Sequence, residues 1–122
     1  MAADASGTAV SITLTYAQGF LQRLCGVFGC PALHPGQGLV LSPCRCVHTF
    51  FLRRPLDLVF FDAAGRCVRV VNNAAPWGVW RCSQAVGVVE LPGGFLRDVP
   101  QALDTLQRML CARARGRAQC QP

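Results

Sequence analysis

Asp57 is the residue of this sequence best suited to acid–base chemistry or ligand binding. It lies in the apolar run Leu56–Phe61, whose other side chains favour burial. A buried carboxylate costs several kcal/mol unless it is paired or hydrogen-bonded. Two interpretations follow: a general base or ligand contact in a pocket, or a structural carboxylate that forms an ion pair or fixes the Arg53-Arg54-Pro55 bend. The nearby candidate partners are His48, Thr49, Arg53 and Arg54.

His48 and Glu90 are the other candidates for proton transfer. His48 lies in an expected strand, and Glu90 follows the apolar run Val86–Val89. Imidazole and carboxylate groups can act as general acids and bases, so these two residues and Asp57 would form an acid/base or metal cluster if they met on one face. The spacing does not require them to meet. For each of them, a satisfied polar residue in a strand is the more common interpretation.

Cysteine is abundant, with eight residues in the chain. The first ten residues lack the basic region of a secretory signal, so we expect a cytoplasmic location, in which thiols stay reduced or bind metal. No pair has the C-x2-C spacing of a zinc ribbon. The alternatives left open are small buried side chains and a metal site. Its candidate ligands are Cys25, Cys30, Cys44 and Cys46, with His48 beside them.

Other chemistries have little support in the sequence. No Gly-x-Ser-x-Gly nucleophile motif occurs, and the glycine pairs at 36–38 and 93–94 are too short for phosphate loops. The aromatic residues Trp77, Trp80 and Phe95 either line a pocket or close one end of the fold. Two pairings of aromatic residues with arginine are weak evidence for nucleic-acid binding. We therefore predict no cofactor and no nucleic-acid partner.

The composition indicates one domain. The chain has 122 residues, of which 52% are hydrophobic and 15% charged, so it can build a core and does not resemble a disordered segment. All twelve basic residues are arginine, and the net charge of +6 favours anionic partners within about 8 Å. Apolar runs are too short to span a membrane. We predict a flexible terminus over residues 1–8, a domain over 9–114 and a flexible basic tail over 115–122.

Hydrophobic periodicity predicts a β-rich fold. Alternating residues indicate strands at 10–16, 39–41, 46–52, 56–61, 67–71 and 85–91, with a turn at 62–65 and a loop at 72–78. Helical spacing predicts a short helix over 18–27 and another from Val99, capped by Asp98 with Pro100 in its first turn. Its apolar stripe, Val99, Leu103, Leu106, Met109 and Leu110, should lie on the sheet. The fold class is mainly β (α+β): a small antiparallel β-barrel or jelly-roll-like domain with a helix near each end.

Three sequence blocks carry a family resemblance. They are the run from Gly38 to Asp62, the pair Pro76-Trp77 and the run from Val88 to Gly94. Together with Phe20–Gly26, they resemble the signature of domain-of-unknown-function family 192, a bacterial and archaeal family. The resemblance covers about residues 10–95. It implies a compact barrel or jelly-roll-like domain with a short N-terminal helix, and no established activity.

Two departures from the family pattern bear on function. Leu52 stands where members often carry Met after the His-Thr-Phe motif. After Gly94, the predicted helix from Val99 replaces the usual turn and final strand. Any site lined by that strand is therefore in question in this chain.

These observations favour a non-enzymatic module that binds a small ligand or a protein segment, as a monomer or weak homodimer. The first alternative is a hydrolase- or isomerase-like enzyme that uses His48, Asp57 and Glu90, and the second is a cysteine-based metal-binding protein. The predicted ligand site lies at one end of the barrel and comprises His48, Arg53, Arg54, Asp57, Trp77 and Glu90.

Overall fold

The computed structural model describes residues 10–17, 34–49 and 54–120. Its larger sheet has the strand order β1-β2-β7-β4-β5, in which β1 and β2 are parallel and the other pairs antiparallel. The strands are β1 (Thr13–Ala17), β2 (Gln37–Leu41), β7 (Gly87–Pro92), β4 (Leu56–Phe61) and β5 (Cys67–Ala74). A two-stranded ribbon pairs β3 (Cys46–His48) with β6 (Val79–Arg81), and the helices are α2 (Phe95–Asp98) and α3 (Ala102–Cys120).

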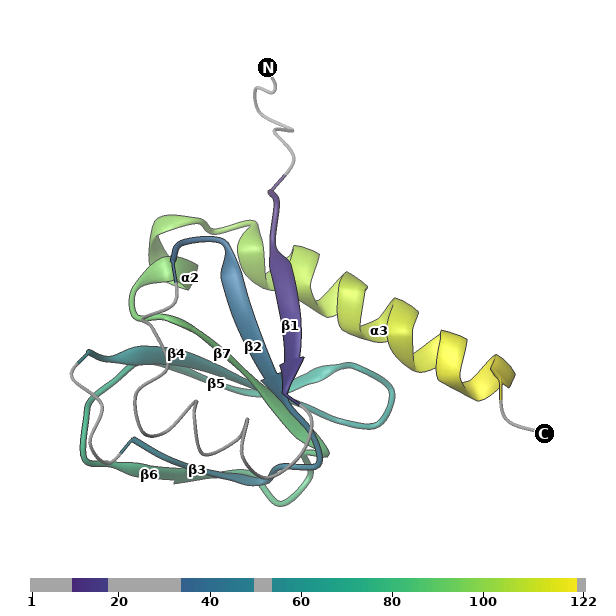
Figure 1. Ribbon diagram of the computed structural model, residues 1–122, viewed down its shortest axis with the longest axis horizontal. Helices are drawn as coiled ribbons and strands as arrows, with labels where there is room; N and C mark the ends of the chain where they lie inside the picture. Colours follow the sequence, from purple (N-terminus) through teal and green to yellow (C-terminus); the bar gives the residue numbers. More distant parts are fainter. Residues whose placement is uncertain (1–9, 18–33, 50–53, 121–122) are drawn as a thin grey trace.

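The five-stranded sheet separates two hydrophobic cores, with α3 and the β3–β6 ribbon on opposite sides (Figure 1). Successive residues of a strand point to opposite faces, so each buried strand supplies both cores. The helix-side core includes Val59, Val89, Leu91, Leu106 and Leu110. The ribbon-side core includes Val47, Leu58, Phe60, Cys82 and Val88. Because β4 and β7 are covered on both faces, their sequences are apolar throughout apart from Asp57 and Glu90.

Helix α3 lies on the sheet through residues spaced at helical intervals. Ala102, Leu106 and Leu110 are buried, and Leu103 and Met109 pack beside them. The predicted apolar stripe therefore does face the sheet. The start of the helix was predicted wrongly, because Asp98 closes the separate short helix α2 and α3 begins at Ala102. The helix also continues through the basic residues Arg113, Arg115 and Arg117 to Cys120.

The predicted barrel is not confirmed. Within the described strands, the larger sheet ends at β1 and β5, which do not pair with each other, and the ribbon is a separate sheet. The coarser α+β class is correct, since the described residues form mostly strands together with helices α2 and α3. Strand 56–61 was predicted with its observed bounds. In contrast, β5 continues to Ala74 and β6 lies just beyond it, where the sequence suggested a loop at 72–78 and no strand.

Some predictions lie outside the described residues. They include the helix over 18–27 and the end of the strand predicted over 46–52, of which β3 covers Cys46–His48. The division into a terminus, a domain over 9–114 and a tail over 115–122 stays a prediction. No helix in the described part of the chain is long and apolar enough to cross a membrane.

Candidate functional site

Asp57 is fully buried, and its carboxylate accepts three backbone hydrogen bonds. Oδ1 accepts from the N–H of Asn73 at 2.7 Å and of Gly94 at 3.0 Å, and Oδ2 accepts from the N–H of Leu96 at 2.9 Å. Gly94 is the N-cap of α2 and has no side chain of its own to cap the helix. The Asp57 side chain, from a distant strand, therefore satisfies amides at the start of this helix.

Three of the four partners considered for Asp57 are not the ones that the described hydrogen bonds show. Its described hydrogen bonds go to backbone amides and none to His48, Thr49 or Arg54. Arg53 lies outside the described residues, and Arg54 is exposed. Of the two interpretations, the structural carboxylate fits the geometry better, and it ties β5 and α2 to β4. The bend predicted at Arg53-Arg54-Pro55 begins outside the described residues.

Glu90 is also buried, but on the other face of the sheet. It pairs with Leu58 in β4, whereas Asp57 pairs with Leu91. Paired residues share a face and successive residues alternate, so Glu90 points toward the ribbon side and Asp57 toward the helix side. Burial raises the pKa of Glu90 to about 7. A carboxyl group in this setting is neutral in mildly acidic solution.

The three candidate proton-transfer residues are therefore not brought together. The sheet separates Asp57 from Glu90, and His48 lies exposed on β3 of the ribbon. Each group has a different environment: hydrogen-bonded amides for Asp57, apolar strands for Glu90 and the outer surface for His48. The acid/base cluster considered from the sequence does not form in this arrangement.

A buried threonine organises the loop that carries Trp77. The Oγ1 of Thr49 donates to the carbonyl of Ala75 at 2.7 Å and accepts from the N–H of Gly78 at 2.8 Å. The backbone N–H of Thr49 also donates to the carbonyl of Gly78 at 2.9 Å, and its carbonyl accepts from the N–H of Trp77 at 2.8 Å. Thr49 therefore holds the loop through both its side chain and its backbone.

Trp77 is the most exposed large hydrophobic residue described, at 63% of its surface. Its φ of +66° lies in the left-handed region, which is unfavourable for a bulky L-residue. The next residue, Gly78, packs closely against the ring of Trp80. A Cβ added to Gly78 would lie 2.1 Å from that ring. The loop is thus fixed between Thr49 and Trp80 and presents Trp77 to solvent in a strained backbone conformation.

The outer face of the ribbon adjoins this loop. His48 and Val79 are cross-strand partners on that face, while Val47 and Trp80 point inward to the ribbon-side core. Val79 exposes 46% of its surface. Of the six residues predicted for the ligand site, His48 and Trp77 therefore come from adjoining segments at the surface, whereas Asp57 and Glu90 are buried apart.

Five cysteines whose side chains the structure describes are thiols: Cys44, Cys46, Cys67, Cys82 and Cys111. Cys44 is buried and donates through its Sγ to the carbonyl of Cys46. Among the residues that the structure describes, no three His, Cys, Asp or Glu side chains are placed to share a metal ion. Cys25 and Cys30 lie outside that part, so the four-cysteine site stays a prediction.

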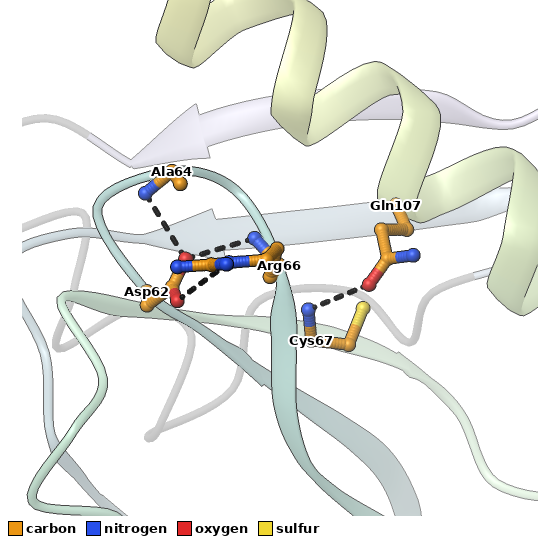
Figure 2. Close-up of polar contacts among 5 residues, drawn as sticks. All are labelled: Asp62, Ala64, Arg66, Cys67 and Gln107. Atoms are coloured by element: carbon orange, nitrogen blue, oxygen red, sulfur yellow. Dashed lines mark hydrogen bonds and ion pairs between the residues drawn. The ribbon is translucent and has the colours of Figure 1, made fainter.

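The turn between β4 and β5 is anchored to itself and to α3 (Figure 2). Asp62 accepts from the backbone N–H groups of Ala64 and Arg66 at 3.0 and 2.9 Å, and its Oδ2 lies 3.3 Å from Nε of Arg66. Desolvation raises the pKa of Asp62, but these bonds and the Arg66 charge lower it more, so the net pKa falls below 3.8. The N–H of Cys67 donates to Oε1 of Gln107 on α3 at 2.9 Å.

A groove opens beside this turn, with a volume of about 410 Å³. Its walls are the end of the sheet, the residues after β2 and the C-terminal half of α3. Apolar side chains form most of its lining, and Arg113 and Arg117 supply positive charge from α3. The guanidinium of Arg113 lies over the ring of Tyr16, 3.8 Å from its centre.

Comparison with known proteins places these features in a family. The sequence model of domain-of-unknown-function family 192, described as "Uncharacterized ACR", matches residues 1–101. The chain belongs to family 192. This confirms the resemblance found in the sequence blocks. No curated protein is similar to the chain at a significant level.

Two solved structures are similar in fold to this member of family 192. A protein of unknown function from Novosphingobium aromaticivorans shares 18% identity with a TM-score of 0.63, covering 73% of this chain and 69% of that one. A Sinorhizobium meliloti protein described as a "putative transcription regulator" shares 21% identity with a TM-score of 0.66, covering 79% of this chain and 80% of that one. At these identities, the likeness concerns the fold.

The family 192 match covers only part of the residues that line the groove. The match ends at residue 101, directly before α3 begins at Ala102. Asp57, Thr49, Trp77 and Glu90 lie within the matched region, but Arg113 and Arg117 lie beyond it. The surface at Trp77 is thus built from the family 192 region, while the groove combines that region with an additional helix.

Sequence reasoning missed the groove and the role of Thr49. The arginines at 113 and 117 are four residues apart, which places them on one helix face. That signal was readable only if the helix was expected to continue past Cys111. Thr49 carried no local signal, because its partners, Ala75 and Gly78, lie in a segment remote in sequence.

Proposed function

We propose that this chain is a non-enzymatic binding module that holds an apolar protein segment against Trp77. The observation that carries this proposal is that Trp77 is 63% exposed while its loop is fixed by the hydrogen bonds of Thr49. Tryptophan is enriched among the residues that contribute most to protein interfaces. An exposed Trp at a fixed position loses little conformational freedom on binding.

Backbone strain at Trp77 supports this proposal. A bulky residue at positive φ costs about 1–3 kcal/mol, and such residues concentrate at functional sites. The φ of Trp77 is +66°. The surrounding hydrogen bonds maintain that conformation although the side chain gains little burial from it. A requirement to present the indole outward accounts for this combination.

The neighbouring ribbon offers the rest of a small contact surface. Val79 adds exposed apolar area two residues from Trp77, and His48 lies opposite it with a polar side chain. An apolar centre with a polar rim is the usual composition of a protein interface. A short segment with one or two large apolar side chains matches this surface in size.

The enzymatic alternative has weaker support. Asp57 uses both carboxylate oxygens to accept backbone hydrogen bonds, and Glu90 faces the opposite side of the sheet. Neither geometry supplies a proton donor and acceptor to one substrate. Metal binding through the cysteines, the cytoplasmic location and the monomeric or weakly dimeric state remain expectations from the sequence.

Peptide selection tests the proposal directly. A random peptide library is selected on the wild-type protein after depletion on Trp77→Ala, and the recovered peptides are titrated by calorimetry. We expect peptides with large apolar side chains, at least about tenfold weaker on Trp77→Ala, the loss of an interface anchor. Trp77→Phe should keep most of the affinity.

The matched control is Val68→Ser, which removes another exposed apolar side chain, on β5. It should leave peptide affinity within about twofold, since it lies outside the proposed surface. Peptides that bind Trp77→Ala as tightly as wild type, or a library that yields no peptide dependent on Trp77, would overturn the proposal.

A further inference from the structure

The groove beside α3 differs in chemistry from the surface at Trp77. The lining of the groove is partly apolar. Its apolar side chains are Val40 from β2, Phe61 from β4, Val86 just before β7 and Leu110 from α3. Its volume of about 410 Å³ falls within the usual range for small-molecule sites. The groove can therefore accept the apolar part of a small molecule.

The charged side chains of the groove are mainly positive. Arg113 and Arg117 project from successive turns of α3, and Asp62 is the acidic residue of the lining. Asp62 is already engaged by Arg66 and by two backbone N–H groups. The groove therefore presents two guanidinium groups against one carboxylate that has its own partners.

The other described carboxylates are engaged or placed elsewhere. Asp57 accepts backbone amides, Asp98 and Asp104 pair with neighbours on their own helices, and Glu90 is buried on the opposite face of the sheet. Within the described part of the chain, no ion pair joins a carboxylate to Arg113 or Arg117. The positive charge of the groove is therefore not neutralised by these residues.

One of the two arginines is held in position. The guanidinium of Arg113 lies 3.8 Å from the centre of the Tyr16 ring, a cation–π contact that favours this position of the group. Arg117 is four residues further along the same helix, so the two side chains are neighbours on its surface. A guanidinium group can donate two hydrogen bonds at once to the oxygens of a carboxylate or phosphate.

We propose that this groove binds a small organic oxyanion: a carboxylate or phosphate group carried on an apolar or aromatic body. The oxyanion lies against Arg113 and Arg117, and the apolar body lies on Phe61, Val86 and Leu110. This site is distinct from the proposed peptide surface, because it uses α3, which follows the end of the family match at residue 101.

Nuclear magnetic resonance titration of the full chain tests the site with four probes. Phenyl phosphate and 3-phenylpropanoate carry the two oxyanions on similar bodies, 3-phenylpropan-1-ol lacks the charge, and inorganic phosphate lacks the apolar body. We expect one or both aromatic oxyanions to shift the amides of Tyr16, Gly65 and Ala114, with a Kd of about 1 mM or tighter. The stronger of the two identifies the preferred oxyanion.

A helix-matched variant separates a site from general charge attraction. Arg117→Ala and Arg115→Ala remove the same charge from exposed positions of α3, but only Arg117 lines the groove. Arg117→Ala should weaken binding about tenfold, the loss of a charge-assisted contact, and Arg115→Ala by less than about twofold. Trp77→Ala should leave oxyanion binding unchanged, so failure of one proposal does not imply failure of the other.

Three outcomes would overturn the oxyanion site. The first is equal weakening by Arg115→Ala and Arg117→Ala, which indicates attraction to the basic helix as a whole. The second is equal affinity for the neutral alcohol and the aromatic oxyanions. The third is that neither aromatic oxyanion shifts the groove amides at millimolar concentration.

Discussion

The carboxylate of Asp57 accepts a hydrogen bond from the backbone N–H of Leu96, which lies 39 residues further along the chain, at 2.9 Å. The same carboxylate accepts from Gly94, which precedes α2, and from Asn73 near the end of β5. One buried side chain thus satisfies one amide of β5, beside the register shift in its pairing with β4, and two amides at the start of α2. Charge-assisted bonds of this kind are stronger than neutral ones, which explains a carboxylate inside an apolar strand.

Replacing Asp57 with asparagine should destabilise the protein. The amide retains one acceptor oxygen, but its NH2 group would face the N–H of Gly94 and Asn73 or of Leu96, leaving a buried donor unsatisfied. We expect Asp57→Asn to lower the free energy of unfolding by about 1–3 kcal/mol, and Asp57→Ala by more, because it leaves three amides without an acceptor. Urea unfolding followed by circular dichroism measures both.

Asp98→Asn is the control for Asp57→Asn, since Asp98 is exposed and, among the described residues, pairs with its neighbour Arg97. It should change stability by less than about 0.5 kcal/mol. A neutral effect of Asp57→Asn would contradict the structural role and return Asp57 to the candidate ligand contacts.

Glu90 should make stability depend on pH in the opposite direction to most carboxylates. Burial raises its pKa to about 7 from 4.5, so between these values the folded protein binds a proton that the unfolded chain has lost. Its contribution is fully present below pH 4.5 and is lost as pH rises through 7. The loss is at most about 3 kcal/mol.

Glu90→Gln isolates this effect from other titrating groups. Glutamine stays neutral, so the stability of the variant relative to wild type should increase as pH rises from 4.5 to 8, by up to about 3 kcal/mol. Chemical unfolding of both proteins across this range provides the test. A pH-independent difference would show that Glu90 ionises in the folded protein much as it does in the unfolded chain.

Local patterns predicted the β-rich fold where each signal was complete in a short window. The run Leu56–Phe61 and the turn after it were recognised because apolar residues and a glycine turn stand side by side in sequence. β6 was missed, because its three residues, exposed at both ends, carry too little periodicity. Closure of the strands is a long-range property, so the predicted barrel had no local test.

The candidate site shows the same division. The sequence identified Asp57 as unusual because burial of a carboxylate can be inferred from its apolar neighbours. It did not identify the partners, which are backbone amides from β5 and α2 and therefore carry no residue signature. Strand register, which places Asp57 and Glu90 on opposite faces, was likewise readable only once β4 and β7 were known to pair.

The hydroxyl of Thr49 should control the loop that carries Trp77. Thr49→Val keeps the shape of the side chain but removes both the donor to Ala75 and the acceptor for Gly78. We expect a loss of about 1–3 kcal/mol in unfolding free energy and a more mobile indole. Trp77 fluorescence anisotropy, recorded with Trp80→Phe in both proteins, measures the mobility.

Thr49→Ser is the matched control, since it retains the hydroxyl. It should preserve the Trp77 anisotropy, with a smaller stability loss from the missing methyl group. If the valine and serine variants show the same anisotropy as wild type, the hydroxyl does not fix the loop, and preorganisation of Trp77 would need another cause.

Close approach of the β4–β5 turn to α3 should make Gly65 irreplaceable. Its φ is +86°, and a Cβ there would lie 2.5 Å from the backbone of Leu110 and Cys111. Gly65→Ala therefore combines an unfavourable φ with a clash against a helix backbone, and should cost about 2–4 kcal/mol.

Gly116→Ala makes the same change on α3, where no atom lies within 4 Å of the new Cβ, and should stabilise by about 0.5–1 kcal/mol. Thermal unfolding of the two variants should move in opposite directions. A Gly65→Ala variant as stable as the wild type would show that the turn and the helix are not in contact as described.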